Sequence, residues 1–225
     1  MRPSALYIVL FWCSALPVLV GAWRWRHLAR EWRLIAVIPA WWITNSLLGL
    51  AWQAWVDRTN NLWVQYLWIA VDAVLVLWIV AGMQRTVWAR NAVRFSIPAY
   101  HLAMLASLRW FESAREFSVI SVPLFGVLAT GLAMYTLLTR AFSDAPDALP
   151  ARQAVTLGWI VLYYGMMGVT SAVLAYYQRH AAWLAMADTL VLRIWFQFAA
   201  SLTATWLLLW PTPATSSGPS PSSAR

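Results

Sequence analysis

The chain alternates long apolar runs with short polar segments. A helix needs about 20 apolar residues to cross a bilayer, and seven runs reach or approach that length. The pattern therefore predicts an all-α, polytopic membrane bundle in residues 1–210. The seven expected transmembrane helices are 4–22, 34–55, 62–82, 95–110, 118–138, 154–177 and 184–210. Residues 211–225 contain only Pro, Ser, Thr, Gly and Ala before a final Arg, a composition that predicts a disordered tail.

Arginines gather in the segments on one side of the predicted bundle. The first such segment carries Arg24, Arg26, Arg30 and Arg33, and the next ones carry Arg85, Arg90, Arg94, Arg140 and Arg152. Arginine-rich short loops stay in the cytoplasm, which predicts an outer N-terminus and a cytoplasmic C-terminal tail. The arginines directly after the first run also favour a retained anchor over a cleaved signal peptide.

Composition supports the membrane interpretation. Hydrophobic residues make up 62% of the 225 residues, and the mean hydropathy is +0.61. The net charge of +8 is spread through the loops and does not form one patch, so we expect no nucleic-acid partner. All 16 basic residues are Arg, which excludes a lysine Schiff base. The single Cys13 excludes an intramolecular disulfide, and the His residues are too dispersed for a metal cluster.

Small residues mark the faces on which helices are expected to pack. In lipid, close approach of two helices depends on such residues. The sixth run has Gly158 and Gly165 at a seven-residue repeat, and the fifth has Gly126 and Thr130. Both stripes predict close packing. The connector 109–117 is expected to be a short amphipathic helix with local ion pairs.

Asp72 lies alone in the middle of the third run. An ionised Asp at the bilayer centre costs roughly 2.5–3.5 kcal/mol, so it needs a partner, a proton or a function. Gln65 and Trp68 share its helix face, and helical rise places Asn45 and His101 near the same depth. Arg193 and Gln197 begin a polar seam in the seventh run. The candidate residues for a ligand site or polar network are thus Asn45, Gln65, Trp68, Asp72, His101, Arg193 and Gln197.

Several interpretations of these residues remain open. Asp72 could be neutralised by Arg193, His101 or a proton within a purely structural network. It could instead orient a ligand together with Asn45, beneath Trp68 or Trp41, or it could exchange protons in a small carrier. A single-histidine haem or pigment site at His101 is a further alternative. The deep tryptophans, Trp42 and Trp159 among them, are expected mainly as lipid-facing bulk.

The stretch DRTNNLWVQYLWIAVDAVLVLW resembles a group of uncharacterised bacterial seven-helix membrane proteins. The matching positions are Asn61, Leu62, Trp63 and Asp72. The resemblance implies seven spans, a bacterial inner membrane and a special role for the third span, but no reaction. No catalytic motif or cofactor signature is found in the sequence. We therefore expect a non-catalytic, sensor-like or accessory subunit that contacts lipids and another membrane protein.

Overall fold

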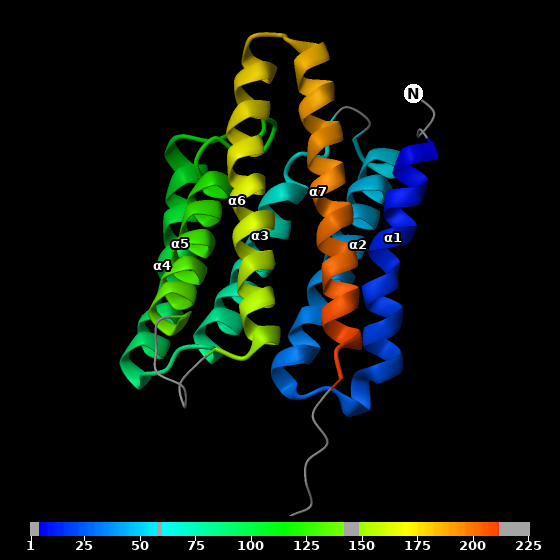
Figure 1. Cartoon of the computed structure of the whole chain (residues 1–225). Helices are drawn as coiled ribbons and strands as arrows, with labels where there is room; N and C mark the ends of the chain where they lie inside the picture. The colour runs from blue at the N-terminus through cyan, green and yellow to red at the C-terminus, as the bar shows by residue number, and fades with distance from the viewer. Residues whose placement is uncertain (1–4, 58–59, 142–148, 212–225) are drawn as a thin grey trace, which may run out of the picture.

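The computed structural model describes residues 5–57, 60–141 and 149–211 as an antiparallel helical bundle (Figure 1). Every element in these ranges is helical, as expected. Besides the short 3-10 helix η1 (Trp25–His27), the described ranges contain seven α-helices: α1 (Ala5–Arg24), α2 (Arg30–Trp55), α3 (Val64–Gly82), α4 (Val87–Trp110), α5 (Ser121–Ala141), α6 (Ala151–Arg179) and α7 (Trp183–Leu209). The expected tail, apart from Pro211, lies outside the described residues.

Helix order in space differs from helix order in sequence. The helices α6 and α7 stand in front of α3, with α4 and α5 to one side and α1 and α2 to the other (Figure 1). The last helix packs against both α1 and α6, while α4 packs only against α3 and α5 among the main helix pairs. The connections α2–α3, α4–α5 and α6–α7 share one end of the bundle, below called the Asn61 end. The opposite end is called the Arg24 end.

Among the described residues, five helices are long and apolar enough to cross a membrane: α2, α3, α5, α6 and α7. Large apolar side chains such as Leu19, Phe95, Val127 and Leu162 are exposed on the outside of the bundle. This combination indicates a membrane-embedded protein. The helix α4 falls outside the set of five and carries Arg90, Arg94 and Arg109.

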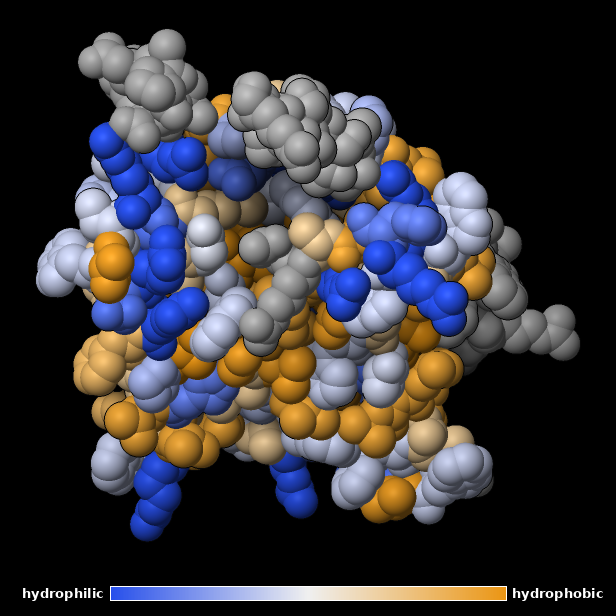
Figure 2. Space-filling view, turned by 90° about the horizontal axis from the view of Figure 1, so that it is seen from below, coloured by the Kyte–Doolittle hydropathy of each residue, from blue (hydrophilic) through white to orange (hydrophobic). Residues whose placement is uncertain are grey.

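Arginines at the Arg24 end bond to the last carbonyls of other helices. Arg24 donates to the Leu208 carbonyl at 2.7 Å, and Arg152 donates to the Leu207 carbonyl at 2.7 Å. Both acceptors lie in the last turn of α7, whose carbonyls have no partner within the helix. Arg152 also stacks 3.7 Å from the centroid of the Trp32 ring. Figure 2 views this end and shows hydrophilic side chains gathered there among apolar ones.

The helices α5 and α6 touch through their backbones. A Cβ added to Gly126 would lie 2.8 Å from both the Gly168 Cα and the Tyr164 carbonyl oxygen. A Cβ on Gly165 would approach the Thr130 hydroxyl to 3.2 Å. The predicted close packing of these stripes is therefore confirmed at these positions. Gly158 differs, because nothing lies within 4 Å of a Cβ added there.

The connector between α4 and α5 is not the short helix that the sequence predicts. After Trp110 the chain runs through turns and bends to Ser121. Glu112 does not pair with Arg109. Instead its carboxylate accepts hydrogen bonds from the hydroxyls of Ser107, Ser118 and Ser121 and from the Ile120 backbone N–H. Partial burial raises the pKa of Glu112, but these hydrogen bonds outweigh burial and hold the pKa below its usual range.

Candidate functional site

Asp72 is fully buried near the middle of α3 and accepts two hydrogen bonds on one oxygen. The indole Nε1 of Trp42 in α2 donates to Oδ2 at 3.0 Å. The hydroxyl of Tyr164 in α6 donates to the same oxygen at 2.8 Å. Within the described residues, Oδ1 has no hydrogen-bond partner. The carboxyl group thus ties three helices together while one of its oxygens stays unused.

These partners are not the ones that the sequence suggests. Asn45 and Arg193 make no hydrogen bond to Asp72 within the described part of the chain. The ring of His101 lies 2.8 Å (Nδ1) from the Ile97 carbonyl and 3.1 Å (Nε2) from the Ala70 carbonyl. The reason is the position of α4, which packs against α3 and α5 and not against α2 or α6 among the main helix pairs. From there His101 reaches the backbone of α3, whereas Asp72 points into the bundle.

Aromatic rings fill the space around Asp72. The Trp42 ring lies 4.6 Å from Tyr163 and 6.3 Å from Trp159, measured between centroids. Tyr164 lies 4.9 Å from Tyr163 and 5.2 Å from Phe125. Such edge and tilted pairs add to the stability gained by burial. Asp72 thus lies within an aromatic layer built from residues of α2, α5 and α6.

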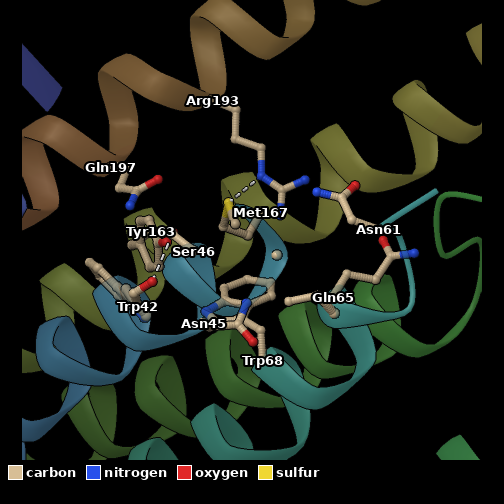
Figure 3. A pocket seen from close by; sticks show the side chains of 12 residues that line it. Trp42, Asn45, Ser46, Asn61, Gln65, Trp68, Tyr163, Met167, Arg193 and Gln197 are labelled. Carbon is tan, nitrogen blue, oxygen red and sulfur yellow. Dashed lines mark hydrogen bonds between the residues drawn. The ribbon is translucent and has the colours of Figure 1, made fainter. Parts of the chain in front are cut away.

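A cavity of about 230 Å³ lies between α2, α3, α6 and α7 (Figure 3). It is called the polar cavity below. The predicted candidates Asn45, Gln65, Trp68, Arg193 and Gln197 all line it, whereas Asp72 and His101 do not. The remaining lining residues are Trp42, Ser46, Gly49, Asn61, Val64, Tyr163 and Met167. Trp42 links the two features, since it lines the cavity and also binds Asp72.

Arg193 is the positive group of the polar cavity. It is half-buried, and in Figure 3 it reaches from α7 toward Met167. Its Nε donates to the Met167 sulfur at 3.1 Å, and its guanidinium carbon lies 5.6 Å from the Trp68 ring centroid. A thioether is a weak acceptor. No carboxylate of the described chain forms an ion pair with Arg193, so its charge is left without a counter-ion.

The amides of the cavity have different roles. Gln65 is held by the α4–α5 connection, donating to the Glu116 carbonyl at 2.7 Å and accepting from the Ser118 N–H at 3.2 Å. It therefore forms part of the wall. The buried Asn45 Oδ1 has no partner among the described residues. In the same part of the chain, Gln197 makes no hydrogen bond with its side chain. These two amides are available to a bound molecule.

Among the residues that the sequence did not single out, Trp42 carries a recognisable signal and the two tyrosines do not. Trp42 precedes Asn45 by three residues and therefore shares its helix face. Extending the polar face of α2 by one turn would have found it. Tyr163 and Tyr164 adjoin the glycine-rich face of α6, but nothing in their spacing predicts which other helix they meet.

Neither the arrangement of potential metal ligands nor comparison with known proteins assigns a further role to these residues. Where the structure describes the chain, no three His, Cys, Asp or Glu side chains converge on one point. The polar cavity offers amide groups and one guanidinium as ligand-binding groups. Comparison of the chain with protein families, curated proteins and solved structures finds no match in any of the three.

Proposed function

We propose that this protein is a non-catalytic, multi-pass protein of the bacterial inner membrane that binds an anionic group in the polar cavity. The observation that carries the proposal is Arg193, whose guanidinium faces a cavity without a carboxylate partner. A half-buried unpaired cation is costly, and an anion supplied by a ligand removes that cost. Asn45 and Gln197 supply further hydrogen bonds that fix the orientation of the anion.

The membrane topology in this proposal has seven crossings. The helices α1 and α4 complete the five that length and composition already support. The Arg24 end faces the cytoplasm, so that the N-terminus is outside and the C-terminus inside. The polar cavity then lies toward the outer face, because Asn61 of the α2–α3 connection contributes to its lining. A ligand from the outer side would thus be detected by helices that reach the cytoplasm, as in a sensor-like or accessory subunit.

A proton-coupled carrier working through Asp72 is the second candidate. The unused Oδ1 of Asp72 is the observation in its favour. The hydrogen bonds of Asp72 stop at Trp42 and Tyr164 and do not continue toward either end within the described residues. A relay needs such a continuation, so this candidate ranks below ligand binding. For haem or pigment at His101, both ring nitrogens already face backbone carbonyls, which leaves neither free to bind a metal.

The ligand-binding proposal is tested by thermal unfolding in phosphatidylcholine nanodiscs. Butyrate and inorganic phosphate are the probes, and they represent a carboxylate and a phosphate. A ligand that binds only the folded state raises the melting temperature in proportion to RT ln(1 + [L]/Kd). We expect at least one probe to raise it for the wild type but not for Arg193→Gln. Arg179→Gln is the control, since Arg179 is exposed and pairs with Glu116 outside the polar cavity. An equal rise in Arg193→Gln would refute the proposal.

The accessory role is tested separately by native mass spectrometry of the protein extracted from its own membrane. We expect a complex with a second membrane protein. If only the monomer with lipid is observed under conditions that preserve a known complex, the accessory role is wrong. The resemblance to uncharacterised bacterial seven-helix proteins stays a prediction.

A further inference from the structure

A second, apolar space lies beside the polar cavity. It is a groove of about 330 Å³ between α6 and α7, called the α6–α7 groove, and Gly158, Leu162, Phe196, Ala199 and Thr203 help to line it. Gly158 leaves room because nothing lies within 4 Å of an added Cβ. On the opposite wall Ala199 is small and exposed. The α5–α6 pair shows the contrast, since there the glycines bring the two backbones into contact.

The groove and the polar cavity lie on either side of a shared residue, Tyr163, which lines both. The helix α7 supplies adjacent residues to the two spaces: Gln197 faces the cavity, while Phe196 faces the groove. The charged Arg193 therefore lines the polar cavity, and mainly apolar side chains line the groove beside it. From Val155 to Tyr163 the groove follows α6 for about 12 Å, at 1.5 Å per residue.

The groove is also accessible from the side of the bundle. Leu162 in its lining is 66% exposed. In a protein embedded in a membrane, such an exposed apolar side chain faces lipid. A molecule dissolved in the bilayer can thus enter the groove without passing through water.

We infer that the ligand is a single-chain anionic amphiphile of the fatty-acid type. Its carboxylate pairs with Arg193 in the polar cavity, and its chain lies in the α6–α7 groove beside Tyr163. The charge of Arg193 selects the anionic head, and the single groove of about 330 Å³ takes the chain. This inference rests on the proposed function and specifies the class of ligand.

Dodecanoate, dodecanol and butyrate separate the contributions of head and chain in phosphatidylcholine nanodiscs. We expect dodecanoate to raise the melting temperature at a concentration at least tenfold lower than butyrate, and dodecanol to have no such effect. Gly158→Leu fills the groove and should remove the advantage of dodecanoate over butyrate while leaving the butyrate response unchanged. Gly131→Leu is the matched control, since nothing lies near its added Cβ either and it does not line the groove. If Gly158→Leu does not fold, Ala199→Leu fills the same groove from α7.

A dodecanoate analogue with a photoreactive diazirine in its chain locates the occupant directly. Labelling should concentrate on residues 155–163 and 196–203, and unlabelled dodecanoate should compete with it. Labels spread evenly over the lipid-facing helices, or unchanged in Gly158→Leu, would overturn the inference. If butyrate and dodecanoate act equally and both need Arg193, the groove assignment fails and the proposed function stands. If neither response depends on Arg193, the proposed function itself fails.

Discussion

Removing the hydroxyl of Tyr164 should destabilise the bundle measurably. In Tyr164→Phe, Asp72 Oδ2 loses a 2.8 Å hydrogen bond at a position where both side chains have no exposed surface. Leaving a buried polar group unsatisfied costs about 1–3 kcal/mol. Because Trp42 still donates to the same oxygen, we expect the lower part of this range, about 1–2 kcal/mol. For a chain of 225 residues this lowers the melting temperature by roughly 2–8 °C.

Tyr163→Phe is the matched control for this prediction. The two tyrosines are adjacent and buried, but the Tyr163 hydroxyl makes no hydrogen bond to any described residue. Equilibrium unfolding in mixed detergent micelles gives the free energy of unfolding of each variant. A double-mutant cycle then repeats Tyr164→Phe in an Asp72→Leu background, where the acceptor is absent. We expect a coupling free energy of about 1–2 kcal/mol between positions 72 and 164.

Two results would refute the reasoning. In the first, Tyr164→Phe would cost no more than Tyr163→Phe. In the second, Tyr164→Phe would cost as much in the Asp72→Leu background as in the wild type. Either result would mean that the stability of this layer comes from ring packing and that the buried carboxyl contributes nothing through Tyr164.

Three further predictions concern other parts of the bundle. Gly126→Ala forces a Cβ against the backbone of α6 at 2.8 Å and should cost about 1–3 kcal/mol in detergent unfolding; an equal cost for Gly131→Ala would contradict this. The lowered pKa of Glu112 stabilises the fold above its unfolded pKa of about 4.3, and this contribution is lost as pH falls through the lower folded pKa. Melting temperatures from pH 6 to 3 should therefore fall less steeply in Glu112→Gln than in the wild type or Glu116→Gln. Arg152→Lys should lower the melting temperature although the charge is kept, because an ammonium cannot reproduce the planar stack on an aromatic ring; an unchanged value would show that charge alone matters.

Hydrophobic patterning was sufficient to predict the helices and much of the polar cavity. A face of a helix is fixed by its period, so Asn45, Trp68 and Arg193 could each be assigned to the interior without a structure. Their meeting in one cavity follows from the adjacency of α2, α3 and α7. The helix α4 is longer than the span expected at 95–110, since it begins at Val87.

The partners of Asp72 could not be predicted in this way. His101 lies beside Ala70, two residues before Asp72 in α3, but position along the helix axis does not say on which side of α3 the helix α4 packs. The expectation that Trp42 and Trp159 face lipid is wrong, because both side chains are buried in the bundle. The helix face that Trp42 shares with Asn45 already indicated the interior. The helix predicted for the connector after α4 is absent for a different reason. The hydroxyls of Ser107, Ser118 and Ser121 donate hydrogen bonds to the Glu112 carboxylate, which therefore needs no ion pair within a helix.

The bond between Arg24 and α7 has a consequence for biosynthesis. Arg24 is made 184 residues before the Leu208 carbonyl that it binds. During synthesis Arg24 must therefore remain without this acceptor until the last helix has been inserted and has docked. A nascent chain that ends after α6 would have Arg24 and Arg152 both without the acceptors that α7 supplies. The hydrogen bonds of Arg24 and Arg152 thus form only when α7 is in place and the bundle is complete.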